Sequence, residues 1–297
     1  MTPKPSQARE TSVDAQVRVS AIVVTRDTGQ PLELCLRSAL AEPWIDELVI
    51  VDNGNPPAVS SALRALQADR RDVALVQGQG DIGHAAGANL GAERARGRWL
   101  LFIDPTVVVQ RGAAERMVAA GGGAKAPWIV GGKITDTRGR ERRIVRRGAL
   151  TPFSAVAIAL GLGAQRLKAP KQDDPRALVD AAAVSAVSGA LMLAPRADFL
   201  RLGGFDALAT GLGAELDLCR RAAEAGGDVL IQPAASGVQF GVRKPDDRDA
   251  KGLARYAARA ARSPIDHAFA AIAGPTLRTI ITLRAVCRHV FGVQPQR

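Results

Sequence analysis

The chain has 297 residues, of which 47% are hydrophobic, and a formal net charge of +11 at pH 7. A chain of this length can bury a full core, so one large domain with a terminal extension is expected. Its three cysteines are far apart and have no zinc-ligand spacing, which argues against a zinc framework and favours a reducing compartment. Aromatic residues make up only 4%, so a stacking platform for single-stranded nucleic acid is not expected.

Residues 1–16 are polar, contain two prolines and lack the apolar core of a signal peptide, which predicts a disordered tail. No apolar run reaches the ~18–20 residues that a membrane-spanning helix needs. We therefore expect a cytoplasmic protein.

The positive charge is concentrated in two segments. Residues 138–176 hold ten Lys/Arg against three acids, and residues 243–297 hold eleven against four. Anionic lipid headgroups, phosphate groups on a substrate or nucleic acid could each attract such charge, although a general use of arginine as a solubilising residue also explains it. No nucleic-acid-recognition motif accompanies the charge, so nucleic acid is not an expected partner.

The first hundred residues alternate short apolar runs with helical patterns. Strands are predicted at 17–25, 47–51, 73–77 and 98–103, and helices at 31–40, 58–68 and, after a loop, within 83–96. Such alternation is typical of βαβ units and a largely parallel sheet, whose ligands bind at the carboxyl ends of the strands. Asp27, Asp52 and Asp104 each follow a predicted strand, so we expect a site there.

The second half is less regular. The predicted elements are a strand with a close backbone approach at Gly189, a helix and a last strand, at 184–194, 215–225 and 228–232. From about residue 245 the composition turns to Ala/Arg-rich helices.

Two local patterns suggest ligand contacts. Asp52 precedes an Asn-Gly turn, where a carboxylate can accept hydrogen bonds from a nucleoside or can simply belong to the turn. The small residues of DIGHAAGANLG at 81–91 permit close approach of backbone to a phosphate, or close packing of a helix on a sheet. His84 in this stretch could contact a diphosphate or be an ordinary surface histidine.

These pieces, in this order, resemble family-2 glycosyltransferases of the GT-A fold, especially the rhamnosyltransferase-like branch. The matching elements are VVT at 23–25, VDNG at 51–54, GHAAGANLG at 83–91, WLLFIDP at 99–105, SGALMLAPRADFLRLGGFD at 188–206 and ELDLCRRAAEAGGDV at 215–229. The resemblance implies an α/β/α sandwich with a mostly parallel central sheet. It divides the chain into a nucleotide-sugar-binding half (17–106), an acceptor-binding half (107–242) that contains the basic insert 138–176, and a C-terminal helical extension (243–297).

The resemblance also implies a site. Asp52 contacts the nucleoside, Asp104 opens the DxD-type motif, and the other donor-contacting positions are Thr25, Asp27, Asn53, Gly83, Asn89 and Gly204. Glu215 occupies the position of the general base, which takes the proton of the acceptor hydroxyl, and Asp217 is the neighbouring alternative. Two acids at the start of a helix could also act only on its dipole.

Three positions depart from the family pattern. Thr106 replaces the metal-binding aspartate that ends the DxD-type motif, the Glu-Asp pair of the base motif falls on Ala214-Glu215, and Gln239 stands where a histidine is often found. Mg²⁺ or Mn²⁺ prefers carboxylate oxygens and offsets charge on the leaving diphosphate, so these departures predict a weakened or absent metal site at Asp104. Basic residues could stabilise the diphosphate instead, the candidates being Arg140, Arg142, Arg143, Arg243 and Lys244.

The predicted reaction is an inverting transfer of a sugar from a nucleotide-diphosphate donor to a hydroxyl of a glycan or polyprenyl-linked acceptor, in cell-surface polysaccharide synthesis. The alternative is a catalytically impaired pseudo-glycosyltransferase that acts as a binding scaffold. Arg255, Arg259 and Arg262 share one helical face, and an apolar set with further arginines follows Pro275. That pattern suits a helix on the anionic inner face of the plasma membrane, or a helix packed on the core with its arginines outward.

Overall fold

The structure is a computed structural model that describes residues 18–142, 151–153, 180–209, 211–241, 247–271 and 279. Three sequence predictions lie outside these residues: the tail 1–16, most of the basic insert 138–176, and the apolar set beyond Pro275. The same holds for Arg143, Arg243 and Lys244.

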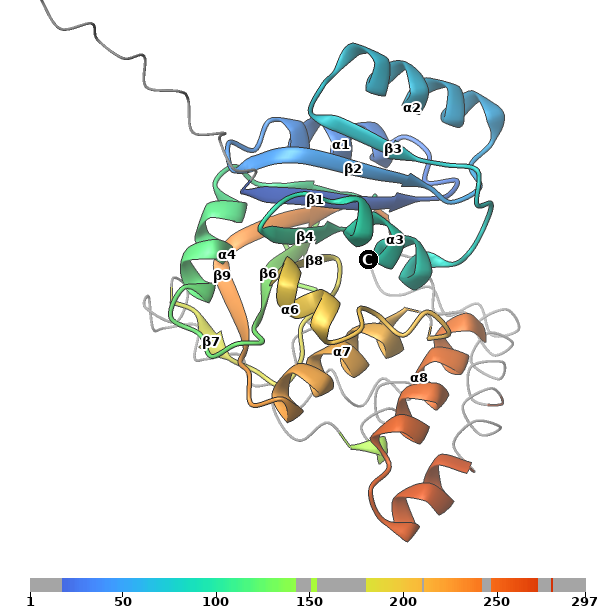
Figure 1. Ribbon diagram of the computed structural model, residues 1–297, viewed down its shortest axis with the longest axis vertical. Helices are drawn as coiled ribbons and strands as arrows, with labels where there is room; N and C mark the ends of the chain where they lie inside the picture. Colours follow the sequence, from blue (N-terminus) through green and yellow to red (C-terminus); the bar gives the residue numbers. More distant parts are fainter. Residues whose placement is uncertain are drawn as a thin grey trace, which may run out of the picture.

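A mixed sheet forms the centre of the described part (Figure 1), with the strand order β3-β2-β1-β4-β8-β6-β9-β5 and β7 paired to β9. The strands are β1 (Val19–Thr25), β2 (Ile45–Asp52), β3 (Val73–Val76), β4 (Trp99–Ile103), β5 (Val107–Val109), β6 (Ile129–Asp136), β7 (Ala182–Ala183), β8 (Leu191–Pro195) and β9 (Val229–Gln239). From β3 to β4 the strands are parallel, whereas β8 is antiparallel to both of its neighbours. β6 and β9 are parallel to each other.

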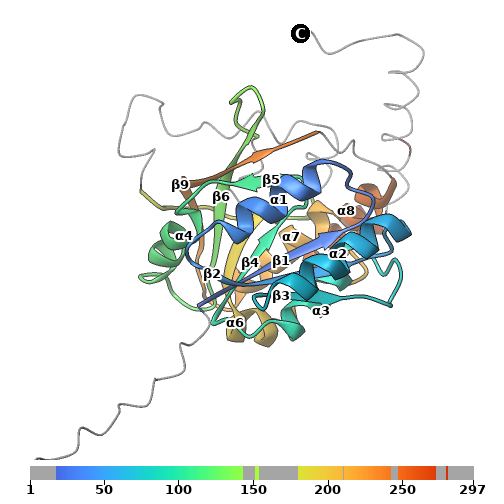
Figure 2. The same cartoon turned by 90° about the horizontal axis from the view of Figure 1, so that it is seen from above.

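Helices cover both faces of the sheet, as Figures 1 and 2 show. They are α1 (Pro31–Leu40), α2 (Pro57–Asp69), α3 (His84–Arg94), α4 (Ala113–Gly121), α6 (Arg196–Arg201), α7 (Leu212–Glu224) and α8 (Asp247–Ala260). Alternate residues of β1 enter different cores: Ile22 and Val24 pack with α3 and α7, and Ala21 and Val23 pack with α1 and α4. A strand covered on both faces must be apolar throughout, which explains the continuous hydrophobic run of β1.

The α/β fold with helices on both faces of the sheet confirms the predicted fold class. Helix 31–40 and the four early strands lie where the sequence predicts them, within two residues at each end. The prediction for 184–194 is wrong in part, because β8 begins only at Leu191. β9 is longer than the predicted strand 228–232, and β5, α4 and β6 have no counterpart among the predicted elements.

α8 packs against α7 and shares the core of the preceding elements. Its residues Leu253, Tyr256, Ala257 and Ala260 are buried in the same cluster as α3 and α7. None of the described helices is both long enough and apolar enough to cross a membrane.

Candidate functional site

The first part of the site lies at the carboxyl ends of β1 and β2. Asp52 ends β2, and its carboxylate accepts hydrogen bonds from Asn55 N (3.0 Å), Asn55 Nδ2 (2.8 Å) and Ser60 Oγ (2.5 Å). Asn55 Nδ2 also donates to the carbonyl of Thr25, which ties the ends of the two strands together (2.9 Å). Burial raises the pKa of Asp52, but the hydrogen bonds from Ser60 and Asn55 outweigh it and lower that pKa overall.

Asp52 opens onto a cavity of about 480 Å³. The other lining residues come from the turn after β2, from α2 and from the loop after β3: Gly54, Asn55, Ser60, Arg64, Gln77, Gly78 and Gly80. This volume is in the range that holds a small ligand. Ser60 and Arg64 were not predicted as site residues, because the sequence around them contains no motif that links them to Asp52.

The remaining early residues hold the loops around this cavity. Asn53 donates to Asp81 Oδ1 (3.1 Å) and accepts from the amide of Ile82 (3.1 Å), so it fixes the loop that leads to Gly83. Asp27 has a positive φ of 47°, and its amide donates to Asn55 Oδ1 (2.8 Å). Thr25, Asp27, Asp52 and Asn53, predicted as one group, do lie together at this edge.

The second part of the site surrounds Glu215, near the start of α7. A small hollow of about 20 Å³ is lined by Glu215, His84 and Ala85 at the start of α3, and Gly189, together with Phe102, Phe205, Gly211 and Ala214. A Cβ atom on Gly189 would lie only 2.9 Å from Glu215 Oε1, so a side chain at this position would displace the carboxylate from its present place. The predicted close approach at Gly189 is therefore real, but it is made to a side chain of α7.

Asp104 adjoins the same segment from β4. Its amide donates to the carbonyl of Ala190 (3.0 Å), the residue after Gly189, so Asp104 and Glu215 flank one short stretch of chain. One carboxylate oxygen of Asp104 accepts hydrogen bonds from the amide of Thr106 (2.8 Å) and from its hydroxyl. Gln239 Nε2 lies 3.1 Å from Thr106 Oγ1, which brings two of the three departing positions into contact.

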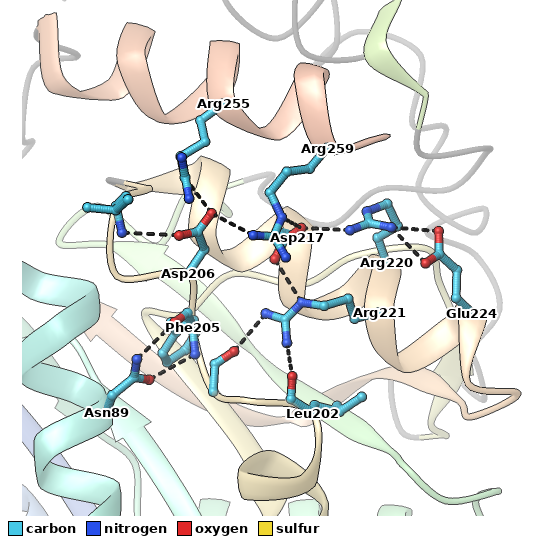
Figure 3. A network of polar contacts seen from close by, with 12 residues as sticks. Asn89, Leu202, Phe205, Asp206, Asp217, Arg220, Arg221, Glu224, Arg255 and Arg259 are labelled. Atoms are coloured by element: carbon cyan, nitrogen blue, oxygen red, sulfur yellow. Dashed lines mark hydrogen bonds and ion pairs between the residues drawn. The ribbon is translucent and has the colours of Figure 1, made fainter. Parts of the chain in front are cut away.

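Asp217 differs sharply from Glu215. Its side chain is 1% exposed and pairs with Arg220 (2.8 Å), Arg221 (2.8 Å) and Arg259 (3.2 Å). Figure 3 shows these guanidinium groups around the carboxylate. Both of its oxygens are thus committed inside the protein, and an acceptor hydroxyl cannot reach them.

The same network joins α8 to the GGFD turn at 203–206. Asp206 in the turn accepts from Arg255 (2.6 Å) and Arg259 (3.3 Å) of α8, and Arg262 pairs with Glu224 of α7. The sequence pattern allowed these arginines to face a membrane or solvent, but the structure points all three toward acids of the core domain.

Asn89 and Gly204 shape the same turn, and Figure 3 shows Asn89 beside Phe205. Asn89 Oδ1 accepts from the amide of Phe205 (2.8 Å), and its Nδ2 donates to the carbonyl of Phe205 (2.8 Å). A Cβ atom on Gly204 would lie 2.5 Å from Asn89 Oδ1, so this clamp requires glycine. Both ends of the Asn89 amide are therefore used within the protein.

Residues 20–147 match the family model described as Glycosyl transferase family 2. No curated protein matches the chain at a significant level.

Solved structures share the GT-A fold of the domain. GalNAc-T7 with UDP, GalNAc and Mn²⁺ has a TM-score of 0.63 at 16% identity, covering 80% of this chain and 47% of that one. The mannosyltransferase PcManGT from Pyrobaculum calidifontis, with GDP-Man and Mn²⁺, has a TM-score of 0.56 at 18% identity, covering 94% and 76%. S. aureus TarS 1-349 with UDP-GlcNAc has a TM-score of 0.55 at 11% identity, covering 94% and 76%. The chain thus spans about half the length of the GalNAc-T7 structure.

Two of these structures hold Mn²⁺. The side chains around Asp104 in this chain do not fit that ion. Among the described residues there, Asp104 supplies the carboxylate, beside a threonine hydroxyl and a glutamine amide. Within the described ranges, no group of three or more His, Cys, Asp or Glu side chains could hold a metal.

Proposed function

We propose that this chain transfers a sugar from a nucleotide-diphosphate donor to a hydroxyl of an acceptor, with inversion at the anomeric carbon. The observation that carries the proposal is the placement of Glu215. Its carboxylate lines a hollow beside the start of α3, while the neighbouring Asp217 is enclosed by arginines. A single displacement needs one base that can reach the acceptor hydroxyl, and Glu215 meets that requirement.

The donor would extend along the carboxyl edge of the sheet. The nucleoside would occupy the 480 Å³ cavity beside Asp52, with Thr25, Asp27 and Asn53 shaping its wall. The diphosphate would pass the start of α3 after Gly83, because the N-terminal end of a helix favours anions. The sugar would then lie between Asp104 and Glu215. In this arrangement Asn89 and Gly204 position the GGFD turn and do not touch the donor.

A membrane-linked pathway is part of the proposal. The basic segments 138–176 and 243–297 support an acceptor on a polyprenyl lipid or glycan in cell-surface polysaccharide synthesis, at the anionic inner face of the plasma membrane. The motifs of the sequence support the rhamnosyltransferase-like branch of the family-2 glycosyltransferases. The departures from the family pattern at Thr106, Ala214 and Gln239 motivate the second candidate, a scaffold that binds nucleotide without transfer.

Glu215→Gln tests the reaction. With UDP-, GDP- and dTDP-sugars and a membrane extract as acceptor, nucleoside diphosphate release should fall about 10²–10⁴-fold, since a general base contributes that much. Calorimetric affinity for the nucleotide should stay within about twofold of the parent. Glu93→Gln, on the exposed side of α3, is the matched control and should leave release unchanged.

Two results would count against this function. Full release by the Glu215→Gln protein would remove Glu215 from the chemistry. Nucleotide binding by the parent protein with no release for any donor would favour the scaffold instead.

A further inference from the structure

We propose that this site binds the donor diphosphate without a divalent cation, through hydrogen-bond donors that Arg142 orients. The inference rests on the proposed function and concerns the same site. It starts from a chain of hydrogen bonds that runs from Arg142 through Gln239 and Thr106 to Asp104.

The direction of every bond in this chain is fixed by its first member. A guanidinium carries only donors, so the atom of Gln239 that faces Arg142 Nη1 at 2.9 Å must be the amide oxygen. The amide NH₂ must therefore point to Thr106 Oγ1, at 3.1 Å. The hydroxyl of Thr106 accepts that hydrogen bond and donates one of its own to the carboxylate of Asp104. Arg142 also donates to the carbonyl of Gly241 (2.7 Å), which anchors it beside the end of β9.

This arrangement opposes a cation at the position. The NH₂ group of Gln239 is a donor and cannot ligate a metal, and it cannot rotate by 180° without setting its NH₂ against Arg142. The Thr106 hydroxyl is engaged on both sides. Of the side chains in this chain of hydrogen bonds, only Asp104 remains as a hard oxygen ligand, and one of its oxygens already accepts two hydrogen bonds. Mg²⁺ and Mn²⁺ sites are built from several such ligands.

The same arrangement favours a diphosphate. Gln239 Nε2 has a second N–H, and Arg142 is half-buried, with no carboxylate of the described residues within ion-pair distance. A guanidinium that pairs with no described carboxylate and is partly shielded from bulk water can stabilise the charge that develops on a leaving diphosphate. Arg140, two residues earlier, instead pairs with Asp136 at 3.1 Å on the exposed surface.

Calorimetric titration with UDP, GDP and dTDP tests the inference on the whole chain. For the nucleotide that binds, we expect the dissociation constants in EDTA and in about 5 mM Mn²⁺, an ample excess over protein, to agree within about twofold. Tightening of tenfold or more by Mn²⁺ would overturn the metal-free site and leave the proposed function standing. Absence of binding by all three nucleotides in both buffers would overturn the proposed function and this inference with it.

Two variants sharpen the test. Arg142→Met should weaken the bound nucleoside diphosphate about tenfold or more in EDTA, while its monophosphate weakens less than about twofold. Arg140→Met should change neither. An equal loss for diphosphate and monophosphate, or no loss at all, would contradict a role for Arg142 at the diphosphate.

A double variant at Thr106 and Gln239 gives a test that does not depend on how well Arg142→Met folds. Thr106→Asp combined with Gln239→His supplies two metal ligands where the hydrogen-bond chain now lies. We expect this double variant to bind Mn²⁺ in the presence of the nucleotide, as measured by electron paramagnetic resonance, whereas the parent protein binds none. Equal Mn²⁺ binding by the two proteins would overturn the inference.

Discussion

The first half of the described chain, with β1 to β4, and the second half, with α7 and α8, are held in shape by different interactions. At the ends of β1, β2 and β3 the loops are joined largely by amides and hydroxyls, with Asn55 bridging Thr25, Asp27 and Asp52. Around α7 and α8 the order comes from buried carboxylates enclosed by arginines. The two acids near the start of α7 differ in their surroundings: arginines enclose Asp217, whereas Glu215 lines the hollow.

Removing the charge of Asp217 should give the largest effect on stability. Asp217→Asn leaves three guanidinium groups around a neutral side chain, and breaking a buried ion pair in this way costs roughly 3–5 kcal/mol. Urea denaturation should show this loss in the free energy of unfolding. Glu33→Gln, which breaks the exposed pair with Arg37, is the control and should cost less than about 0.5 kcal/mol. Similar losses in the two variants would mean that the arginines around Asp217 contribute no more to the free energy of unfolding than an exposed ion pair does.

The glycine pair of the GGFD turn gives a smaller and better matched comparison. Gly203 and Gly204 both have a positive φ, 82° and 68°, but an added Cβ meets nothing within 4 Å at Gly203 and meets Asn89 Oδ1 at 2.5 Å at Gly204. Gly203→Ala should therefore cost about 1–2 kcal/mol from backbone strain alone. Gly204→Ala should cost at least about 1 kcal/mol more, because Asn89 is held by Phe205 and cannot move aside.

Equal costs for the two glycine variants in the same urea assay would show that Asn89 yields easily. The clamp between α3 and the turn would then be weaker than its two hydrogen bonds indicate.

The smallest expected effect is on the pH dependence of stability, to which Asp52 in the first half and Asp206 in the second half both contribute. Burial raises the pKa of Asp206, but the bonds from Arg255 outweigh it and lower that pKa overall; hydrogen bonds from Ser60 and Asn55 do the same for Asp52. For both groups the folded-state pKa lies below the unfolded value, so the stabilisation is present above about pH 4 and is lost as pH falls further. Asp206→Asn and Asp52→Asn should each flatten the fall in Tm from pH 5 to pH 3.

Salt distinguishes the two causes. Added NaCl should shrink the contribution of Asp206, whose partners Arg255 and Arg259 are 37% and 42% exposed, and should leave that of Asp52 nearly unchanged. The same response of both variants to salt would contradict the division between neutral and ionic contacts.

Sequence reasoning succeeded where a structural signal is local. The βαβ alternation predicts β1 to β4 and α1, and a turn after a strand identifies Asp52. It could not find contacts between distant residues: Asn89 and Phe205 are 116 positions apart, and Thr106 and Gln239 are 133 apart. The role of Asp217 had a readable signal, because Arg220 and Arg221 follow it at i+3 and i+4, where helical side chains meet.

The central claim is that the first half binds the nucleotide and Glu215 of the second half performs the chemistry. Calorimetric titration of the same nucleoside diphosphate into Asp52→Asn and Glu215→Gln tests it most directly. We expect Asp52→Asn to weaken binding about tenfold or more, and Glu215→Gln to stay within about twofold of the parent. Equal weakening in both variants, or unchanged binding by Asp52→Asn, would contradict the account.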